Sequence, residues 1–286
     1  MKVFILALDA LEYNLVTKWD MENLKQTTYG KFKLSPEYFH EEENVPYTPI
    51  VWASFITGKK PSEHRIKSIF TYGKLLEKLR WFKPIKAIKG KRKILWKLGI
   101  KPRTVNRGDL NLSTIFDKVK PSIAFQVPTY NESTELNLIL RVFLQEKSIK
   151  EFIQKTWEIF HLKRRQLFEI LDKQKDWKLF MAYFKVADLL GHVYLKKNPK
   201  KLKEVYFILD TLTEEIKEKM PNNILFLIVS DHGMQIGDDP VFASHSNHAF
   251  WSLNIKTNWK PKDITDFYPK IIEWTKAETT KQFQVK

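Results

Sequence analysis

Residues 225 to 234 read LFLIVSDHGM, an apolar run that stops abruptly at a neighbouring aspartate and histidine. A short, continuous apolar run of this kind is typical of a strand that is buried on both faces of a parallel sheet. Asp231 and His232 therefore lie where a buried strand meets its loop. Since ligands in open α/β sheets bind beyond the carboxyl ends of the strands, the stretch predicts both the fold class and the edge of the sheet that carries the site.

Comparable β-rich runs recur along the chain, and longer helical patterns separate them. This alternation predicts an α/β fold with a largely parallel central sheet. The expected strands are Val3 to Leu8, Ile123 to Val127, Leu179 to Phe184, Ile224 to Val229 and Phe250 to Asn254. The expected helices are Ser113 to Val119, Leu136 to Gln145, Ile149 to Lys173 and Leu202 to Met220.

Length and composition narrow the class of protein. With 286 residues, 43% of them hydrophobic, the chain can bury a full core, and we expect one domain over residues 1–286. No apolar run reaches the length of a membrane span, and Asp9 interrupts the opening MKVFILALDAL before it could form a signal-peptide core. We therefore expect a cytoplasmic protein. Cysteine is absent, so any metal must bind to His, Asp or Glu.

Basic residues concentrate in one segment. Residues 74–103 contain twelve Lys or Arg and the single acid Glu77, so they supply 11 of the net charge of +16. Their apolar residues predict two short amphipathic helices that are broken near Pro84 and Gly90, in an inserted basic helical cap over residues 71–107. Three interpretations stay open: a hairpin that packs on the domain, a cap that draws anionic substrate to the site, and a membrane-surface anchor.

Three carboxylates follow three of the expected strands. Asp9 ends the first strand, Asp188 lies just beyond Leu179 to Phe184, and Asp231 follows the strand quoted above. Any one of them could be a helix N-cap. Because the strands are expected to be parallel, however, all three carboxylates should reach the same edge of the sheet.

Histidines accompany these carboxylates at ligand spacing. His192 comes four residues after Asp188, which places both on one face if the segment is helical, and His232 follows Asp231 directly. A third histidine lies downstream in FASHSNHAF, where His245 and His248 are alternatives and His245 is preferred. Three carboxylates and three imidazoles form a ligand set for two divalent ions.

A nucleophile candidate precedes Pro49 in YTPIVWASFITG. Thr48 lies at the expected start of a helix that includes Val51 to Thr57 and ends at Gly58. The positive end of the helix dipole favours an oxyanion at this position. The alternative is that Thr48 serves only as the helix N-cap.

The order of these motifs resembles the alkaline phosphatase superfamily, and most closely its type I phosphodiesterase/nucleotide pyrophosphatase branch. The resemblance implies an alkaline-phosphatase-like three-layer sandwich. The motifs that carry it are Asp9 at the end of a strand, Thr48-Pro49 with Thr57-Gly58, Pro61 and His64, then Asp188-x-x-Gly191-His192, Ser230-Asp231-His232-Gly233, and His245.

The resemblance also implies a two-metal phosphoester hydrolase with a covalent phosphothreonine intermediate. One metal would be held by Asp188, His192 and His245, and the other by Asp9, Asp231 and His232 with the nucleophile Thr48. Zinc fits the histidine-rich site best, with manganese or another divalent ion as the alternative. The expected partner is an anionic phosphate-ester small molecule, with peripheral contact to an anionic membrane as an additional interpretation, and nucleic acid is not expected.

Two departures from the family pattern leave the reaction type open. Phosphodiesterase relatives usually carry an asparagine three residues after the nucleophile, where this chain has Val51. The family often has His-Gly-Ile where this chain has His64-Arg65-Ile66. A phosphomonoesterase or phosphotransferase on the same site therefore stays an alternative, as does a non-catalytic protein that binds anionic surfaces.

Overall fold

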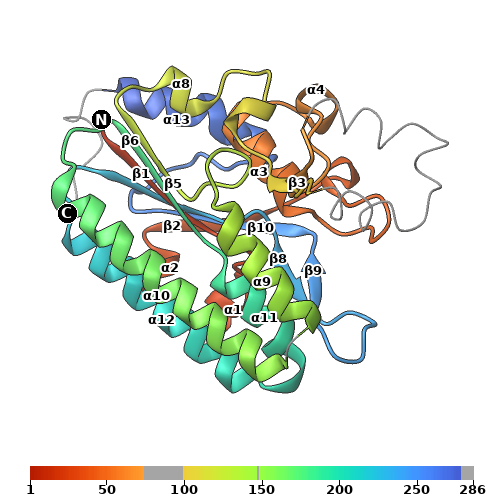
Figure 1. Ribbon diagram of the computed structural model, residues 1–286. Helices are drawn as coiled ribbons and strands as arrows, with labels where there is room; N and C mark the ends of the chain where they lie inside the picture. Colours follow the sequence, from red (N-terminus) through yellow and green to blue (C-terminus); the bar gives the residue numbers. More distant parts are fainter. Residues whose placement is uncertain (74–98, 147, 278–286) are drawn as a thin grey trace.

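The computed structural model describes residues 1–73, 99–146 and 148–277 (Figure 1). Most of the predicted basic cap over residues 71–107 lies outside the described residues. Its two ends are described: strands β3 (Phe70–Thr71) and β4 (Arg103–Thr104) pair with each other in an antiparallel ladder. The chain thus leaves the fold and returns to it at adjacent points.

A central sheet of six strands forms the middle layer, in the order β2-β10-β7-β1-β6-β5. Strands β5, β6, β1 and β7 are parallel neighbours, whereas β10 is antiparallel to both β7 and β2. The strands are β1 (Val3–Leu8), β2 (Thr28–Lys33), β5 (Ser122–Phe125), β6 (Leu179–Phe184), β7 (Leu225–Val229) and β10 (His248–Leu253). The predicted α/β fold with a mostly parallel sheet is confirmed.

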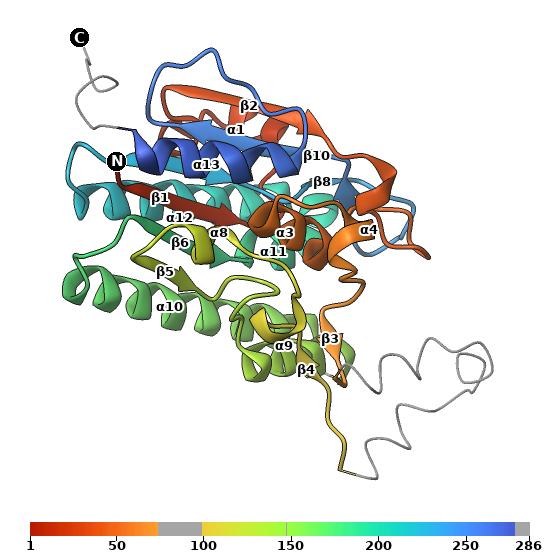
Figure 2. The same cartoon turned by 90° about the horizontal axis from the view of Figure 1, so that it is seen from above.

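Helices cover both faces of this sheet (Figures 1 and 2). One face packs against α1 (Tyr13–Lys18), α2 (Glu22–Lys25), α9 (Thr134–Glu146), α10 (Ile149–Lys173), α11 (Val186–Lys197) and α12 (Pro199–Glu218). The other packs against α3 (Thr48–Thr57), α8 (Ile115–Lys118), α13 (Phe267–Lys276) and the 3₁₀ turn η3 (Ile264–Asp266). Shorter elements are η1 (Pro36–Tyr38), α4 (Pro61–His64) and η2 (Arg107–Asp109).

Strand β1 divides the core into two halves. All six of its residues are buried, and they alternate between the two helical layers because successive side chains of a strand point to opposite faces. Val3, Ile5 and Ala7 pack towards α3 and α13, while Phe4, Leu6 and Leu8 pack towards α10 and α12. This double burial explains why the strand is an uninterrupted apolar run.

None of the described helices combines the length and the apolarity that a membrane span needs.

The predicted elements differ from the observed ones mainly at their ends. β1, β6 and α10 match the predicted residues one for one. β5 ends at Phe125 instead of Val127 because Gln126 adopts a left-handed backbone with φ of 57°. The edge strand β2, which reads TYGKFK, was not predicted, since exposed polar residues and Gly30 mask its periodicity.

Gly58 supports a prediction about helix α3. It is the C-cap of α3 with φ of 64°, and a Cβ there would lie 2.6 Å from Cγ of Tyr268. Gly58→Ala should therefore lower the free energy of unfolding by about 2–4 kcal/mol in urea titrations, through both backbone strain and overlap. Gly73→Ala is the matched control, because Gly73 also has positive φ (91°) but a Cβ there meets no described atom within 4 Å. Equal losses in the two variants would show that the Tyr268 contact contributes nothing.

Candidate metal centre

Three neighbouring strands bring the predicted carboxylates to one edge of the sheet. Asp9 directly follows β1, and Asp231 comes two residues after the end of β7. Asp188 lies in the first turn of α11, which begins two residues after β6. Since β6, β1 and β7 are adjacent and parallel, their carboxyl ends meet, and the three side chains gather there.

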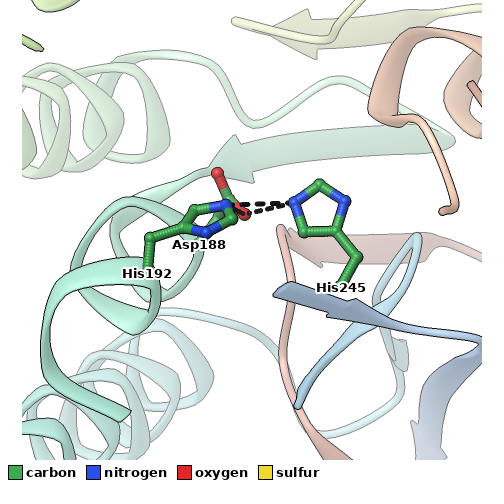
Figure 3. Close-up of side chains that lie close together, drawn as sticks. All are labelled: Asp188, His192 and His245. Carbon is green, nitrogen blue, oxygen red and sulfur yellow. Dashed lines mark hydrogen bonds and ion pairs between the residues drawn. The ribbon is translucent and has the colours of Figure 1, made fainter. Parts of the chain in front are cut away.

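The outer cluster consists of Asp188, His192 and His245, all half-buried (Figure 3). Asp188 and His192 lie four residues apart on helix α11, so their side chains share a face. His245 approaches from strand β9 (Ser244–Ser246), which pairs with β8 (Gly233–Gln235). Asp188 Oδ1 lies 3.2 Å from Nε2 of His192 and 3.3 Å from Nε2 of His245, and the two Nε2 atoms are 3.1 Å apart.

The inner cluster consists of Asp9, Asp231 and His232, all buried. His232 Nε2 lies 3.4 Å from Asp9 Oδ1 and 3.4 Å from Asp231 Oδ2. In each cluster the three candidate ligand atoms lie within 4.8 Å of one another. The structure therefore brings together all six predicted ligands in two groups of three, whereas His248, the alternative to His245, starts β10 and belongs to neither group.

The two clusters adjoin, and Thr48 lies beside one of them. The rings of His232 and His245 stack with centroids 3.8 Å apart and an interplanar angle of 20°. Thr48 Oγ1 is 3.2 Å from Nε2 of His232. Thr48 is the first residue of α3, and the N-cap is Tyr47, without a capping side-chain hydrogen bond. The N-cap alternative for Thr48 is thus wrong, and its hydroxyl is directed to the inner cluster.

Backbone carbonyls hold the three imidazoles in one tautomer. Nδ1 of His192 is 2.6 Å from the carbonyl oxygen of Ala243, and Nδ1 of His245 is 2.8 Å from that of Pro46. Nδ1 of His232 lies 3.1 Å from the carbonyl oxygen of Gly233. A carbonyl oxygen can only accept a hydrogen bond, so each Nδ1 carries a proton, and a ring that is neutral directs its Nε2 lone pair into a cluster. This is the arrangement that metal-binding histidines adopt.

Three carboxylate oxygens in the clusters are hydrogen-bond acceptors that lack a donor. Asp9 Oδ1, Asp188 Oδ1 and Asp231 Oδ2 are buried, and none receives a hydrogen bond from the described residues. Unpaired buried acceptors are costly, and here they converge with imidazole lone pairs of the same polarity. A cation in each cluster would satisfy them all. The residues present therefore fit two divalent metal ions.

The pKa values of the cluster residues also favour a cation at these positions. Burial, together with the charges of Asp231 and Asp188, raises the pKa of Asp9 well above its usual range. Burial lowers the pKa of His232 to about 4. Burial also lowers the pKa of His192, but the neighbouring Asp188 charge outweighs it and raises this pKa to about 9. Without a metal ion, a proton on His192 is the cation that the outer cluster can recruit.

Glu12, three residues after Asp9, connects the loops around the inner cluster. The sequence analysis did not identify this residue. Its buried carboxylate accepts hydrogen bonds from the backbone N–H of Asn14 (3.0 Å) and Met234 (3.1 Å) and from the hydroxyl of Ser246 (2.8 Å). A Cβ on Gly233 would lie 2.0 Å from Oε2 of Glu12. The glycine that follows His232 therefore makes room for this carboxylate.

Tyr183 supports Asp9 from the neighbouring strand. Its buried hydroxyl donates to Asp9 Oδ2, and the backbone N–H of Ala10 donates to Asp231 Oδ1 over 3.3 Å. Each inner carboxylate thus has one oxygen bound to the protein and one directed at the cluster. In the sequence, Tyr183 is indistinguishable from the other buried residues of LFMAYF, so only its three-dimensional partner reveals the role.

Comparison with known families matches nearly the whole chain. The family described as type I phosphodiesterase / nucleotide pyrophosphatase matches residues 3–284. No curated protein matches the sequence significantly.

Solved structures to which the chain is similar include murine ectonucleotide pyrophosphatase / phosphodiesterase 5, with 15% identity and a TM-score of 0.48 over 83% of this chain and 59% of that one. An inactive form of that murine protein in complex with AMP gives 14% identity, the same coverage and a TM-score of 0.48. Phosphonoacetate hydrolase from Sinorhizobium meliloti in complex with phosphonoformate gives 11% identity and a TM-score of 0.46, over 84% of this chain and 58% of that chain. The chain thus spans less than two thirds of each of these proteins.

The raised pKa of His192 gives a pH prediction for protein stripped of metal with EDTA. Because its folded pKa of about 9 exceeds the unfolded value near 6.5, the ion pair with Asp188 stabilises the fold fully below about pH 6.5 and is lost as pH rises through 9. In urea titrations between pH 6 and 10, wild type should lose up to about 3 kcal/mol relative to His192→Asn. His161→Asn, at an exposed position of α10, is the control. Wild-type and His192→Asn curves that stay parallel would rule out the ion pair.

Proposed function

The chain belongs to the type I phosphodiesterase / nucleotide pyrophosphatase family, and on this premise we propose that it hydrolyses phosphate esters at the outer and inner clusters. The observation that carries the proposal is the convergence of unpaired carboxylate oxygens and imidazole lone pairs on two adjoining points, with the Thr48 hydroxyl at the inner one. An ordinary core would pair such groups with donors. The complete ligand set and the placement of the hydroxyl support catalysis over a purely binding role.

Each cluster is proposed to hold one divalent ion. Asp188, His192 and His245 would bind the first, and Asp9, Asp231 and His232 would bind the second together with Thr48. Mixed nitrogen and oxygen donors in groups of three to four suit zinc best, and manganese is the alternative. Divalent ions in adjoining sites would supply electrostatic stabilisation of the attacking and leaving oxygens in an in-line displacement at phosphorus.

Thr48 is the proposed nucleophile. Its Oγ1 lies 3.2 Å from Nε2 of His232, the atom that would bind the second ion, so the hydroxyl lies next to the position proposed for that ion. Thr48 Oγ1 would lose its proton to solvent and form a bond to phosphorus while the bond from phosphorus to the ester oxygen breaks; that oxygen takes up a proton from solvent, and the enzyme is left as a phosphothreonine. Water would then displace Thr48 and restore the hydroxyl. The position of Thr48 in the first turn of α3 adds the positive end of the helix dipole, which favours the developing negative charge.

The proposed substrate is a small anionic phosphate ester, in keeping with the net charge of +16. A diester is the first expectation from the family. Val51, at the position where the relatives usually carry a phosphate-binding asparagine, is fully buried in the core. Since this side chain cannot contact the phosphate, monoester hydrolysis or phosphoryl transfer is a second candidate reaction. Zinc-loaded protein assayed on bis(nitrophenyl) phosphate and on nitrophenyl phosphate separates the two.

Thr48→Ala should lower kcat on the preferred ester by about 1,000-fold or more, since it removes the attacking oxygen. The same variant should retain both metal ions, because six other ligands stay in place. Thr48→Ser is the matched control: it keeps a hydroxyl at the same position and should retain most of the activity. Comparable turnover by the alanine variant would exclude the covalent mechanism.

Metal analysis of protein purified without chelator should find two divalent ions per chain. Asp231→Asn or His192→Ala should bring the content towards one, whereas His248→Ala should leave it at two because His248 lies in neither cluster. Metal content should also fall in acid, since histidine ligands must be neutral to bind. One ion or none after supply of zinc and manganese would defeat the two-ion proposal.

A further inference from the structure

The buried carboxylate of Glu12 bonds to both strands of the hairpin that carries His245. This hairpin is the antiparallel pair of β8 and β9, in which His245 lies opposite Met234 and Ser246 lies opposite Gly233. Oε2 of Glu12 accepts a hydrogen bond from the Met234 N–H over 3.1 Å and another from the Ser246 hydroxyl over 2.8 Å. The carboxylate is therefore bonded to the residue opposite His245 and to the residue that follows it.

Glu12 is itself held firmly at the end of the central sheet. Its side chain is the N-cap of α1, where the other carboxylate oxygen accepts from the Asn14 N–H over 3.0 Å. Its own N–H donates to the hydroxyl of Tyr206 over 2.8 Å, and the residue is only 3% exposed. A two-stranded hairpin is marginally stable alone, so an acceptor fixed to the sheet can hold this one in place.

The absence of a side chain at Gly233 is what permits this contact. A Cβ there would lie 2.0 Å from Oε2 of Glu12 and 2.6 Å from Oγ of Ser246. Any other residue at this position would push the carboxylate and the hairpin apart. The close approach of three segments is thus built into the loop that links His232 to β8.

The two clusters differ in how their ligands are held. Asp9 and Asp231 of the inner cluster follow buried strands of the six-stranded sheet, and each has one oxygen bound by a donor. In the outer cluster, Asp188 and His192 come from α11, whereas His245 comes from the hairpin (Figure 3). The outer cluster therefore depends on how this hairpin is placed.

Contacts on the other side of the hairpin complete the support of His245. Its Nδ1 donates to the carbonyl oxygen of Pro46 over 2.8 Å, which fixes the rotation of the ring. The N–H of Ala243 donates to the carbonyl oxygen of His192 over 2.9 Å, which joins the hairpin to α11. Glu12 supplies the restraint towards the end of β1, and without it the hairpin would be held on one side.

We propose that Glu12 is a positioning residue that holds His245 in place and thereby sets the affinity of the outer cluster for its ion. The inference rests on the two-ion proposal above. Glu12 belongs to neither group of ligands, since both of its oxygens are bonded to donors. Loss of such a supporting partner typically weakens metal binding by about 10- to 100-fold. The inner cluster should change little, because none of its ligands lies in β8 or β9.

Zinc affinities of single-site variants, measured by competition with a chelator, test this role. Ser246→Ala removes one donor to Glu12 but leaves the cap of α1 intact. In an Asp231→Asn background, where the remaining ion occupies the outer cluster, Ser246→Ala should weaken zinc binding about 10-fold or more. In a His192→Ala background, which reports the inner cluster, it should change the affinity by no more than about twofold. Ser252→Ala, which removes a buried hydroxyl that bonds away from both clusters, should change neither value.

A double-mutant cycle in the Asp231→Asn background assigns the effect to the contact itself. Glu12→Ala should weaken zinc binding at least as much as Ser246→Ala, and adding Ser246→Ala to it should cost nothing further, because both remove the same bond. Additive losses, unchanged affinity, or equal losses in the Asp231→Asn and His192→Ala backgrounds would overturn the role of Glu12 and leave the two-ion proposal standing. Absence of zinc binding in both backgrounds would overturn the two proposals together.

Discussion

The pairing of β1 with β6 on one side and β7 on the other is the constraint from which the site follows. In this register Leu8 lies opposite Phe184 and Ala7 lies opposite Val229, so all three strands end at nearly the same level. The residues that follow these strands therefore lie close together in a small volume. Three carboxylates in that volume repel one another, and burial together with this repulsion by Asp231 and Asp188 raises the pKa of Asp9.

Hydrogen bonds to the atoms that face away from the clusters limit the energetic cost of this crowding. Tyr183 and the backbone of Ala10 each take one oxygen of an inner carboxylate, and three carbonyl oxygens take the Nδ1 protons of the imidazoles. The groups are thereby oriented before any ion arrives, so binding need not order them. Glu12 extends the same principle to the loops, because it ties the segment after β1 to the segment after β7 and to β9.

Sequence reasoning succeeded where local pattern determines structure. Buried parallel strands are continuous apolar runs, so β1 and β6 were predicted to the residue, and the grouping of Asp9, Asp188 and Asp231 followed from the parallel order. It failed where a role depends on a distant partner. Tyr183 has the appearance of an ordinary core aromatic residue and Glu12 that of a surface acid, until folding places each beside its hydrogen-bond partner. β2 escaped notice because an edge strand carries polar residues on its exposed side.

The short ladder between β3 and β4 has a consequence for how the chain tolerates change. Phe70 pairs with Thr104 and Thr71 pairs with Arg103, so the two ends of the intervening segment are already joined at the fold. The entropy of closing a loop grows only with the logarithm of its length, by about 0.6 kcal/mol for each doubling. Residues between the two strands can therefore be lengthened, shortened or exchanged with little effect on the sheet, which leaves this stretch free to diverge while the rim of carboxylates stays in place.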